Sequence, residues 1–257
     1  MPEGDSVFRA ARSLYDALAG SVVTRFDLRV PRLATADLRG ETVREVVPRG
    51  KHLLMRIGDR TLHSHLKMEG RWDVYAHGVR WRRPAFQARA VVGTARCDAV
   101  GFDLAMLDLV ATSDEGELVG HLGPDPLGAE WDAAEAARRV GSDSRPIHVA
   151  LQDQRNVAGL GNEYVNEVLY VRGVAPSRPA TQVDVVPLME TAARMLRTNV
   201  ARPVRTFTGD DRPGRRTWVY RREGKPCRRC GTAIRSGELG AHPTEERIVF
   251  WCPHCQN

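Results

Sequence analysis

Cys227-Arg228-Arg229-Cys230 and Cys252-Pro253-His254-Cys255 are two Cys-x-x-Cys segments, and their spacing predicts the structure of the last part of this chain. Each segment offers two thiolates, and structural zinc sites take four such ligands in a tetrahedron. The 21 residues from 231 to 251 lie between the two pairs, enough for a β-hairpin. In a reducing compartment, clustered cysteines favour a metal over disulfides. We therefore expect one structural Zn²⁺ held by Cys227, Cys230, Cys252 and Cys255.

The residues just before this cysteine module are strongly basic. From Arg212 to Arg229 there are eight Arg or Lys residues and one acid, Glu223, with Trp218 and Tyr220 interleaved. Such a run is typical either of a solvated linker or of a surface that contacts nucleic-acid phosphates. The neighbouring zinc hairpin and the net charge of +6 favour the phosphate-contacting surface.

The first half of the chain predicts one helix followed by short strands. Residues 5–19 carry an apolar stripe at helical spacing, with Asp5 or Ser6 as a candidate cap and Gly20 as a stop. Alternating runs punctuated by Gly and Pro then fill residues 21–120, which predicts a β-sandwich or barrel. The clearest runs span residues 22–30, 42–47, 52–57 and 61–66.

Helical spacing returns after residue 130. The predicted helices span residues 131–140, 146–154, 163–171 and 187–199. No run approaches the roughly 18 apolar residues that a membrane helix needs. The first residues have neither the basic nor the apolar region of a signal peptide, so we expect a cytoplasmic protein.

Gly159-Leu160-Gly161-Asn162 precedes the third of these helices. A glycine turn that runs into a helix N-terminus presents backbone N–H groups and the positive end of the helix dipole, which suit a phosphate. Asn162 stands where an N-cap belongs, and its amide can also donate to a phosphate. A plain turn between two helices, capped by Asn162, is the alternative.

The start of the chain, Met1-Pro2-Glu3-Gly4, offers unusual chemistry. A proline at position 2 permits removal of Met1, which leaves a secondary amine with a pKa of about 8 that is partly neutral at pH 7. Such an amine attacks an aldehyde-level carbon to give an iminium ion, and Glu3 can act beside it as acid or base. The alternative is that Pro2 is an ordinary start residue.

Arg49-Gly50-Lys51-His52 lies between two of the predicted strands. Glycine at this point predicts a tight turn that carries Lys51. By itself this is typical of an exposed, solubilising lysine, and only the wider pattern gives it another role.

Taken in order, these motifs resemble those of the formamidopyrimidine-DNA glycosylase and endonuclease VIII family over the whole chain. Met1-Pro2-Glu3-Gly4 resembles the family's catalytic signature, and Arg49-Gly50-Lys51 resembles its hairpin lysine motif. Further similar segments are His65-Leu66-Lys67-Met68-Glu69-Gly70, Leu122-Gly123-Pro124-Asp125, and residues 153–164, 219–227 and 247–256. Within the family, the chain is most similar to the second, actinobacterial type of endonuclease VIII.

The resemblance implies an α+β multidomain fold. Residues 1–125 would form the N-terminal catalytic domain, a helix plus a β-sandwich. Residues 126–220 would form the helical DNA-binding domain with a helix–two-turn–helix motif, and residues 221–257 the four-cysteine zinc-finger hairpin.

The resemblance also implies base-excision repair, in which one enzyme removes an oxidised base and cleaves the strand by β- and δ-elimination. Pro2 would be the nucleophile that forms the iminium (Schiff base) intermediate on a flipped-out nucleotide, and Glu3 would protonate the sugar. Lys51 and Arg247 would bind phosphate and assist elimination. The expected DNA-contacting residues are Lys67, Met68 as a wedge between base pairs, Asn162 and His121.

At two places this sequence differs from the pattern of the family, and the differences concern the substrate and one contact to DNA. The oxidised-purine branch carries Asp-Pro-Arg-Arg-Phe-Gly in a loop that probes the opposite strand, whereas this chain has Asp103-Leu104-Ala105-Met106-Leu107-Asp108. The loss of both arginines favours oxidised pyrimidines over 8-oxoguanine. His121 stands at or near a position where the endonuclease VIII branch has a DNA-contacting arginine.

Two other functions fit part of this pattern. One is a non-catalytic zinc-hairpin DNA-binding protein, which loss of Pro2, Glu3 or Lys51 would indicate; all three are present. The other is a lyase that acts mainly on abasic sites. The expected partner is damaged double-stranded DNA, with single-stranded or bubble DNA as an alternative. We expect a monomer without membrane association, located at the nucleoid in a bacterium.

Overall fold

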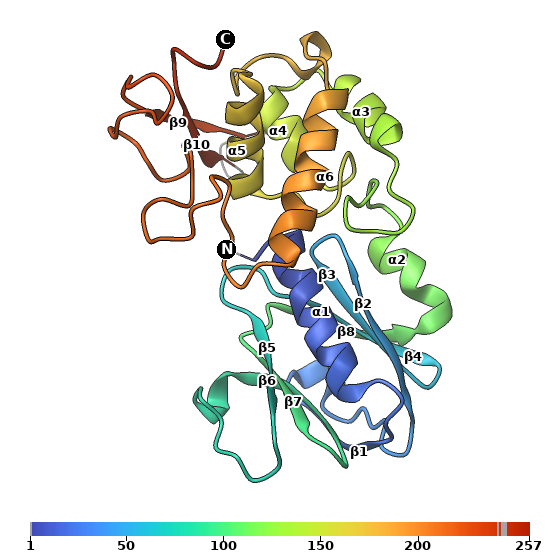
Figure 1. Ribbon diagram of the computed structural model, residues 1–257. Helices are drawn as coiled ribbons and strands as arrows, with labels where there is room; N and C mark the ends of the chain where they lie inside the picture. The colour runs from blue at the N-terminus through green and yellow to red at the C-terminus, as the bar shows by residue number, and fades with distance from the viewer. Residues whose placement is uncertain (1, 241, 243–245) are drawn as a thin grey trace. The chain divides into compact units, whose positions relative to one another are not determined.

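The computed structural model describes residues 2–240, 242 and 246–257. The chain divides into two compact units, Met1–His121 and Leu122–Asn257, each with its own hydrophobic core (Figure 1). Met1, whose removal the sequence predicts, lies outside the described residues. No helix among the described residues has the length and apolarity needed to cross a membrane.

Unit 1 contains two four-stranded antiparallel sheets, in the orders β1-β6-β7-β5 and β2-β3-β4-β8. The strands are β1 (Val23–Leu28), β2 (Val43–Arg49), β3 (His52–Ile57), β4 (Arg60–His65), β5 (Arg71–Tyr75), β6 (Ala88–Thr94), β7 (Asp98–Phe102) and β8 (Met106–Ala111). The helical segments are α1 (Gly4–Leu18), α2 (Glu115–Val119), η1 (Pro31–Leu33), η2 (Ala85–Gln87) and η3 (Thr112–Asp114). The predicted helix plus β-sandwich is therefore confirmed.

Helix α1 forms because its apolar residues recur at helical spacing and have a sheet to pack against. Val7, Ala11, Leu14 and Leu18 are all buried, in one core with the inward-facing residues of the strands. The predicted cap was wrong: Asp5 and Ser6 lie inside the helix, and the N-cap residue is Glu3. Asp5 instead forms an ion pair with Arg9, one helical turn later, at 3.3 Å.

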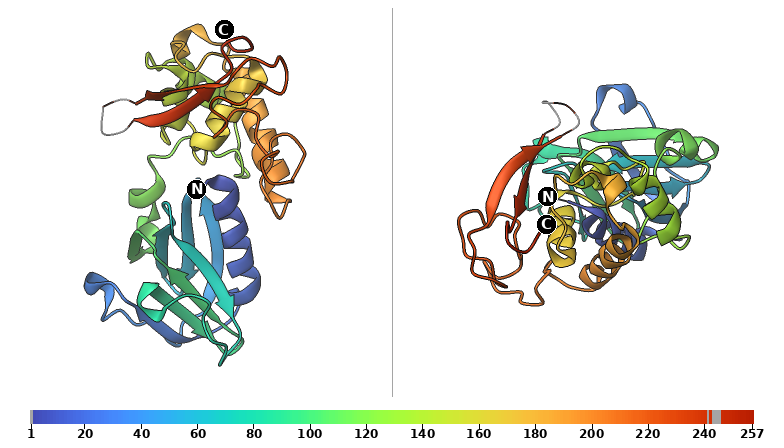
Figure 2. Two further views of the ribbon diagram at one scale, coloured as in Figure 1. Left: turned by 90° about the vertical axis from the view of Figure 1, so that its left-hand side faces the viewer. Right: turned by 90° about the horizontal axis from the view of Figure 1, so that it is seen from above.

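Unit 2 is helical, with a β-hairpin near its end. Its helical segments are α3 (Ala133–Gly141), α4 (Ile147–Gln152), α5 (Asn162–Arg172), η4 (Ala180–Gln182) and α6 (Val186–Val200). The hairpin consists of β9 (Arg235–Leu239) and β10 (Arg247–Trp251), and Figure 2 shows it beside α5. The N-cap of α3 is Asp132, whose carboxylate accepts hydrogen bonds from two backbone N–H groups of the first turn. The four predicted helices are thus all present, with ends shifted by up to two residues.

Candidate functional site

Pro2 and Glu3 immediately precede the first turn of α1. The backbone oxygen of Glu3 accepts hydrogen bonds from Ser6 N at 2.9 Å and Val7 N at 3.1 Å, which starts the helix. Glu3 is fully buried, whereas Pro2 is half-buried. A carboxyl group thus lies in a dry position directly beside the proposed amine nucleophile.

Lys51 lies in the two-residue turn that joins β2 to β3. Arg49 pairs with His52 across the turn, and Gly50 has φ +59°, as at the first central position of a type II′ turn. A side chain at Gly50 would be strained in this conformation. Figure 1 shows this turn at the same end of unit 1 as the start of α1, so Pro2, Glu3 and Lys51 share that end.

The β4–β5 loop carries Lys67 and Met68 at the same end of the sheet, because β4 ends at His65, which pairs with His52. Lys67 has φ +51°, an uncommon value for a residue with a side chain. Met68 is 59% exposed, as a residue that wedges into DNA must be. Gly70 closes the loop: its N–H donates to Leu66 O, and a Cβ at Gly70 would lie 2.4 Å from that oxygen.

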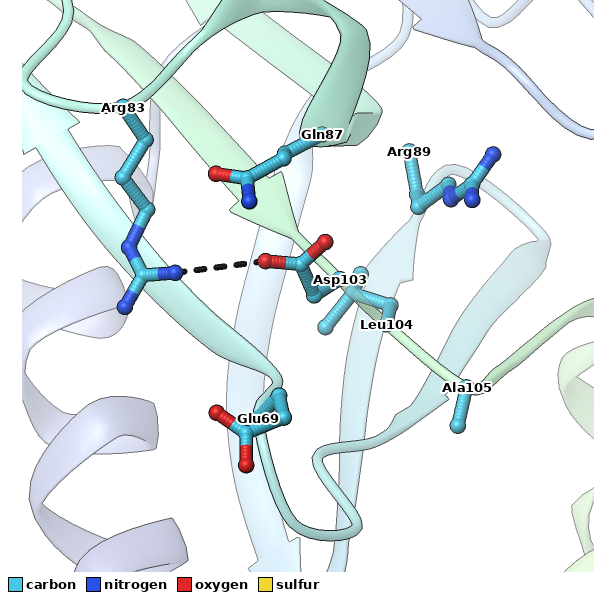
Figure 3. A pocket seen from close by; sticks show the side chains of 7 residues that line it. All are labelled: Glu69, Arg83, Gln87, Arg89, Asp103, Leu104 and Ala105. Carbon is cyan, nitrogen blue, oxygen red and sulfur yellow. Dashed lines mark hydrogen bonds and ion pairs between the residues drawn. The ribbon is translucent and has the colours of Figure 1, made fainter.

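A shallow hollow of about 420 Å³ lies next to this loop (Figure 3). Glu69 lines one side, and Arg83 and Asp103 form an ion pair across it at 3.2 Å.

Leu104 and Leu107, in the segment that replaces the arginine-bearing loop of the oxidised-purine branch, are buried in the core. Residues 103–105 join β7 to β8, residues 106–108 begin β8, and none of the six is an arginine.

The sequence reasoning missed a group of histidines on the second sheet. His52 Nδ1 and His63 Nε2 lie 2.8 Å apart, and His63 Nδ1 lies 3.0 Å from a carboxylate oxygen of Asp108. His121, a predicted DNA contact, lies with its ring 6.4 Å from that of His52. Burial and the nearby charges of Lys67 and Lys51 lower the pKa of His65 to about 4. The alternation His63-x-His65 was the only signal in the sequence.

In unit 2, Asn162 is the first residue of α5 rather than its cap. The N-cap position is occupied by Gly161, which has no side chain to cap the helix. The predicted capping role of Asn162 was therefore wrong. Asn162 Nδ2 donates to Ile248 O at 2.9 Å, and Asn162 Oδ1 lies 3.0 Å from His148 Nε2. The side chain of Asn162 thus joins α4, α5 and β10, and the strand it holds begins at the exposed Arg247.

Two further buried groups, both missed in the sequence, attach the hairpin and the segment before it to α5. Asn166 Oδ1 accepts a hydrogen bond from Phe250 N at 2.6 Å. Glu167 is fully buried and accepts three backbone N–H groups, from residues 218–220, at 2.8–2.9 Å. Burial raises the pKa of Glu167 to about 7, although these three donors act in the opposite direction.

The four cysteine sulfurs converge in the way the sequence predicts. All four Sγ atoms lie within 4.8 Å of one another. A tetrahedral ion with Zn–S bonds of about 2.3 Å would hold its sulfurs about 3.8 Å apart. Cys227 Sγ lies 4.0 Å from Cys255 Sγ, and Cys230 Sγ lies 3.5 Å from Cys252 Sγ. These residues therefore fit one metal ion with thiolate ligands.

The basic run before the cysteines has a mixed role. Arg222 is buried and donates to the carbonyl oxygens of Trp218 and Pro226, and Arg212 pairs with Asp210 at 2.6 Å. Some of the arginines counted as a phosphate-contacting surface are thus structural.

Comparison with known proteins agrees with this arrangement. Residues 1–123 match the model of the formamidopyrimidine-DNA glycosylase N-terminal domain, and residues 122–207 match that of the formamidopyrimidine-DNA glycosylase H2TH domain. The chain is 48% identical to "Probable endonuclease 8 2" of Streptomyces coelicolor, over 100% of this chain and 94% of that protein. It is 46% identical to "DNA-(apurinic or apyrimidinic site) lyase Nei2" of Mycolicibacterium smegmatis, over 100% and 99% of the two chains.

Among solved structures, MutM in complex with DNA containing carbocyclic 8-oxo-G aligns over 100% of both chains, with a TM-score of 0.83 and 25% identity. The predicted similarity to the second, actinobacterial type of endonuclease VIII is confirmed by the two relatives above. This chain therefore belongs to the formamidopyrimidine-DNA glycosylase and endonuclease VIII family.

Proposed function

We propose that this protein is a bifunctional base-excision repair enzyme, a DNA glycosylase with AP lyase activity, which removes oxidised bases from damaged double-stranded DNA. The observation that carries this proposal is the position of Pro2 directly before the fully buried Glu3, at the end of unit 1 that also bears Lys51. A secondary amine, an acid and a phosphate-binding cation are the groups that iminium chemistry on a sugar requires.

In the proposed mechanism, the nitrogen of Pro2 attacks C1′ of a flipped-out nucleotide, Glu3 protonates the ring oxygen, and the damaged base leaves. The iminium ion then acidifies the proton on C2′, and β-elimination followed by δ-elimination breaks the strand. Lys51 and Arg247 bind the phosphates that flank the lesion and stabilise their departure.

The remaining site residues bind DNA in this proposal. Met68 fills the space left by the flipped nucleotide, with Lys67 beside it, while His121 and Asn162 contact the backbone. Because the segment 103–108 lacks both arginines, oxidised pyrimidines are the preferred substrates.

Zn²⁺ is the metal that best suits four thiolates at these distances. Cys227, Cys230, Cys252 and Cys255 would hold it, and its role would be to stabilise the hairpin that bears Arg247. We further propose three domains, residues 1–125, 126–220 and 221–257, and a monomer. Since bacterial DNA lies in the cytoplasm, the proposed substrate assigns the protein there, at the nucleoid.

The test is borohydride trapping on an end-labelled duplex with one abasic site. Protein whose intact mass shows that it begins at Pro2 should give a covalent adduct, whereas protein that retains a residue before Pro2 should give none. Absence of an adduct from correctly processed protein would refute the lyase and favour a non-catalytic DNA-binding protein. Duplexes with an oxidised pyrimidine, 8-oxoguanine or an abasic site then distinguish base excision from a lyase that acts mainly on abasic sites, the activity in the name of the mycobacterial relative.

A further inference from the structure

Three side chains on the second sheet of unit 1 form a continuous hydrogen-bonded chain. His63 on β4 stands directly opposite Asp108 on β8, and the atoms His63 Nδ1 and Asp108 Oδ2 lie 3.0 Å apart. His52 comes from the neighbouring strand β3, and its Nδ1 lies 2.8 Å from His63 Nε2. The two imidazole rings are nearly parallel, with planes inclined by 18° and centroids 5.1 Å apart. His63, the middle member of the chain, is only 1% exposed, so its ring is shielded from water.

Asp108, the last residue of this hydrogen-bonded chain, is an ionised carboxylate. Arg32 donates to Asp108 at 2.7 Å, on the oxygen that His63 does not contact. Burial raises the pKa of Asp108, but the hydrogen bonds from His63 and Arg32 outweigh burial, so the pKa lies below its ordinary value. Nδ1 of His63 therefore carries a hydrogen, which it donates to Asp108.

This leaves two arrangements of hydrogen between the two rings. In the first, His52 donates from Nδ1 to Nε2 of His63, and Nε2 of His52 is a bare acceptor. In the second, His63 carries two hydrogens and donates to Nδ1 of His52, whose Nε2 then bears a hydrogen. The second arrangement differs from the first by one proton gained at Nε2 of His52.

The surroundings of His52 decide where the positive charge of that proton resides. His65 on β4, His121 after α2, Lys67 in the β4–β5 loop and the flanking Lys51 and Arg49 are basic groups, and none of them stabilises a cation at His52. Burial, with the charges of His65, His63, His121 and Lys67, lowers the pKa of His52 to about 3. His63 has the carboxylate of Asp108 beside it, so a proton taken up by His52 is best held as a charge on His63.

We propose that Asp108, His63 and His52 form a proton relay that accepts the proton released in the elimination steps, an inference that rests on the lyase function proposed above. His52 directly follows Lys51 and pairs with His65, which precedes the Lys67–Met68 loop. As the first residue of β3, His52 lies directly beside the turn that carries Lys51, at the end of the strand that follows this turn.

The C2′–H bond breaks, its proton passes to Nε2 of His52, and its electron pair neutralises the iminium nitrogen to give an enamine. The hydrogen on Nδ1 of His52 moves to Nε2 of His63, whose positive charge Asp108 stabilises. The enamine then expels the 3′ phosphate and becomes a conjugated iminium. His63 and Asp108 are positioning residues, and His52 is the group that takes the proton.

A metal site is a poorer explanation of the same residues. In the described part of the chain, the four cysteines are the only group of three or more His, Cys, Asp or Glu side chains placed so that they could hold a metal ion, and the histidines do not form such a group.

The test separates iminium formation from elimination. We would prepare His52→Gln, His52→Ala, Asp108→Asn and, as a matched control, His77→Gln, which changes an exposed histidine in the β5–β6 loop. For each protein, borohydride trapping and single-turnover cleavage of a duplex with a preformed abasic site are measured from pH 5 to pH 9, with the unfolding midpoint as a check on folding.

We expect all variants to form the trapped adduct, which would show that iminium formation, the step before elimination, is intact. His52→Gln should slow cleavage by about 10²-fold, within the usual range for loss of a general base. His52→Ala should recover part of that rate when free imidazole is added. Asp108→Asn should shift the acid limb of the rate profile to lower pH, because the protonated relay loses its counterion, whereas His77→Gln should match the unsubstituted protein.

The relay is refuted if folded His52→Gln and Asp108→Asn cleave at the unsubstituted rate with an unchanged pH profile. It is also refuted if His52→Gln loses the trapped adduct, because His52 would then act before elimination. Failure of the unsubstituted protein to form any adduct would instead refute the proposed function.

Discussion

Replacing Asn162 with alanine should impair DNA binding by releasing the strand that bears Arg247, in addition to removing an amide that contacts phosphate. The side chain of Asn162 makes three hydrogen bonds, to Ile248 O, His148 Nε2 and Asn166 Nδ2, at 2.9, 3.0 and 3.0 Å, and the last two are buried. Each contributes about 1 kcal/mol, and unsatisfied buried partners cost about 1–3 kcal/mol each. We therefore expect the free energy of unfolding to fall by roughly 3 kcal/mol.

The salt dependence of binding distinguishes the two effects. A neutral amide that contacts a phosphate releases no counterion from the DNA, so losing that contact leaves the salt dependence unchanged. Loss of one cationic phosphate contact reduces the slope of log K against log salt by about 0.9. If Asn162 positions Arg247, Asn162→Ala should reduce the slope almost as much as Arg247→Ala does. The double variant should bind only slightly more weakly than either single variant, with a coupling free energy of about 0.5–3 kcal/mol.

Binding of an abasic-site duplex at several salt concentrations provides the measurement. Asn162→Ala combined with Arg194→Ala, on α6, serves as the control, since effects at independent sites add. An unchanged salt slope for Asn162→Ala, with additive effects of the Asn162 and Arg247 substitutions, would show that Asn162 does not position Arg247. Asn162 would then be a phosphate contact alone.

Three further predictions concern the metal, the acid and the pH dependence. Cys252→Ser should lose the one zinc ion per chain measured by a chromogenic chelator, together with the contribution of about 0.9 that Arg247 makes to the salt slope. Glu3→Gln should slow excision of an oxidised pyrimidine by about 10²- to 10⁴-fold and affect trapping on a preformed abasic site far less, as single-turnover assays would show. Burial lowers the pKa of His148 to about 4 from 6.5, against the opposing hydrogen bond of Asn162, so the unfolded chain binds the extra proton. Stability should therefore fall by up to about 3 kcal/mol as the pH drops from 7 to 4, and His148→Gln should remove this part of the loss in denaturant titrations.

The sequence predicted those strands and helices that have one buried face. β3 was predicted with its exact bounds because a glycine turn and alternating apolar residues mark it. β6 and β7 gave no such signal, since both of their faces are buried. Val92 and Ala99 face the main core, whereas Val91 and Val100 face a second cluster that Trp81 partly covers. Periodicity cannot reveal a strand whose two faces are both apolar.

The residues of the candidate site likewise include some that the sequence predicts and some that it does not. The cysteine ligands were predictable because their spacing within the chain is itself the signal. The contacts of Asn162 were not, because its partner Ile248 lies 86 residues away and is brought near only by the packing of β10 on α5. Local sequence therefore suggested a cap, and tertiary structure gave the side chain another partner.

The proposed proton relay also depends on the tertiary packing of the sheet. His52 and His63 lie on separate strands, and their alignment with Asp108 depends on the register of β3, β4 and β8. A slip of one residue in that register would turn these side chains to the opposite face of the sheet. The buried inner face, with Leu53, Leu62 and Leu107, fixes the register, so the same apolar packing that holds the sandwich together also aligns the proposed relay.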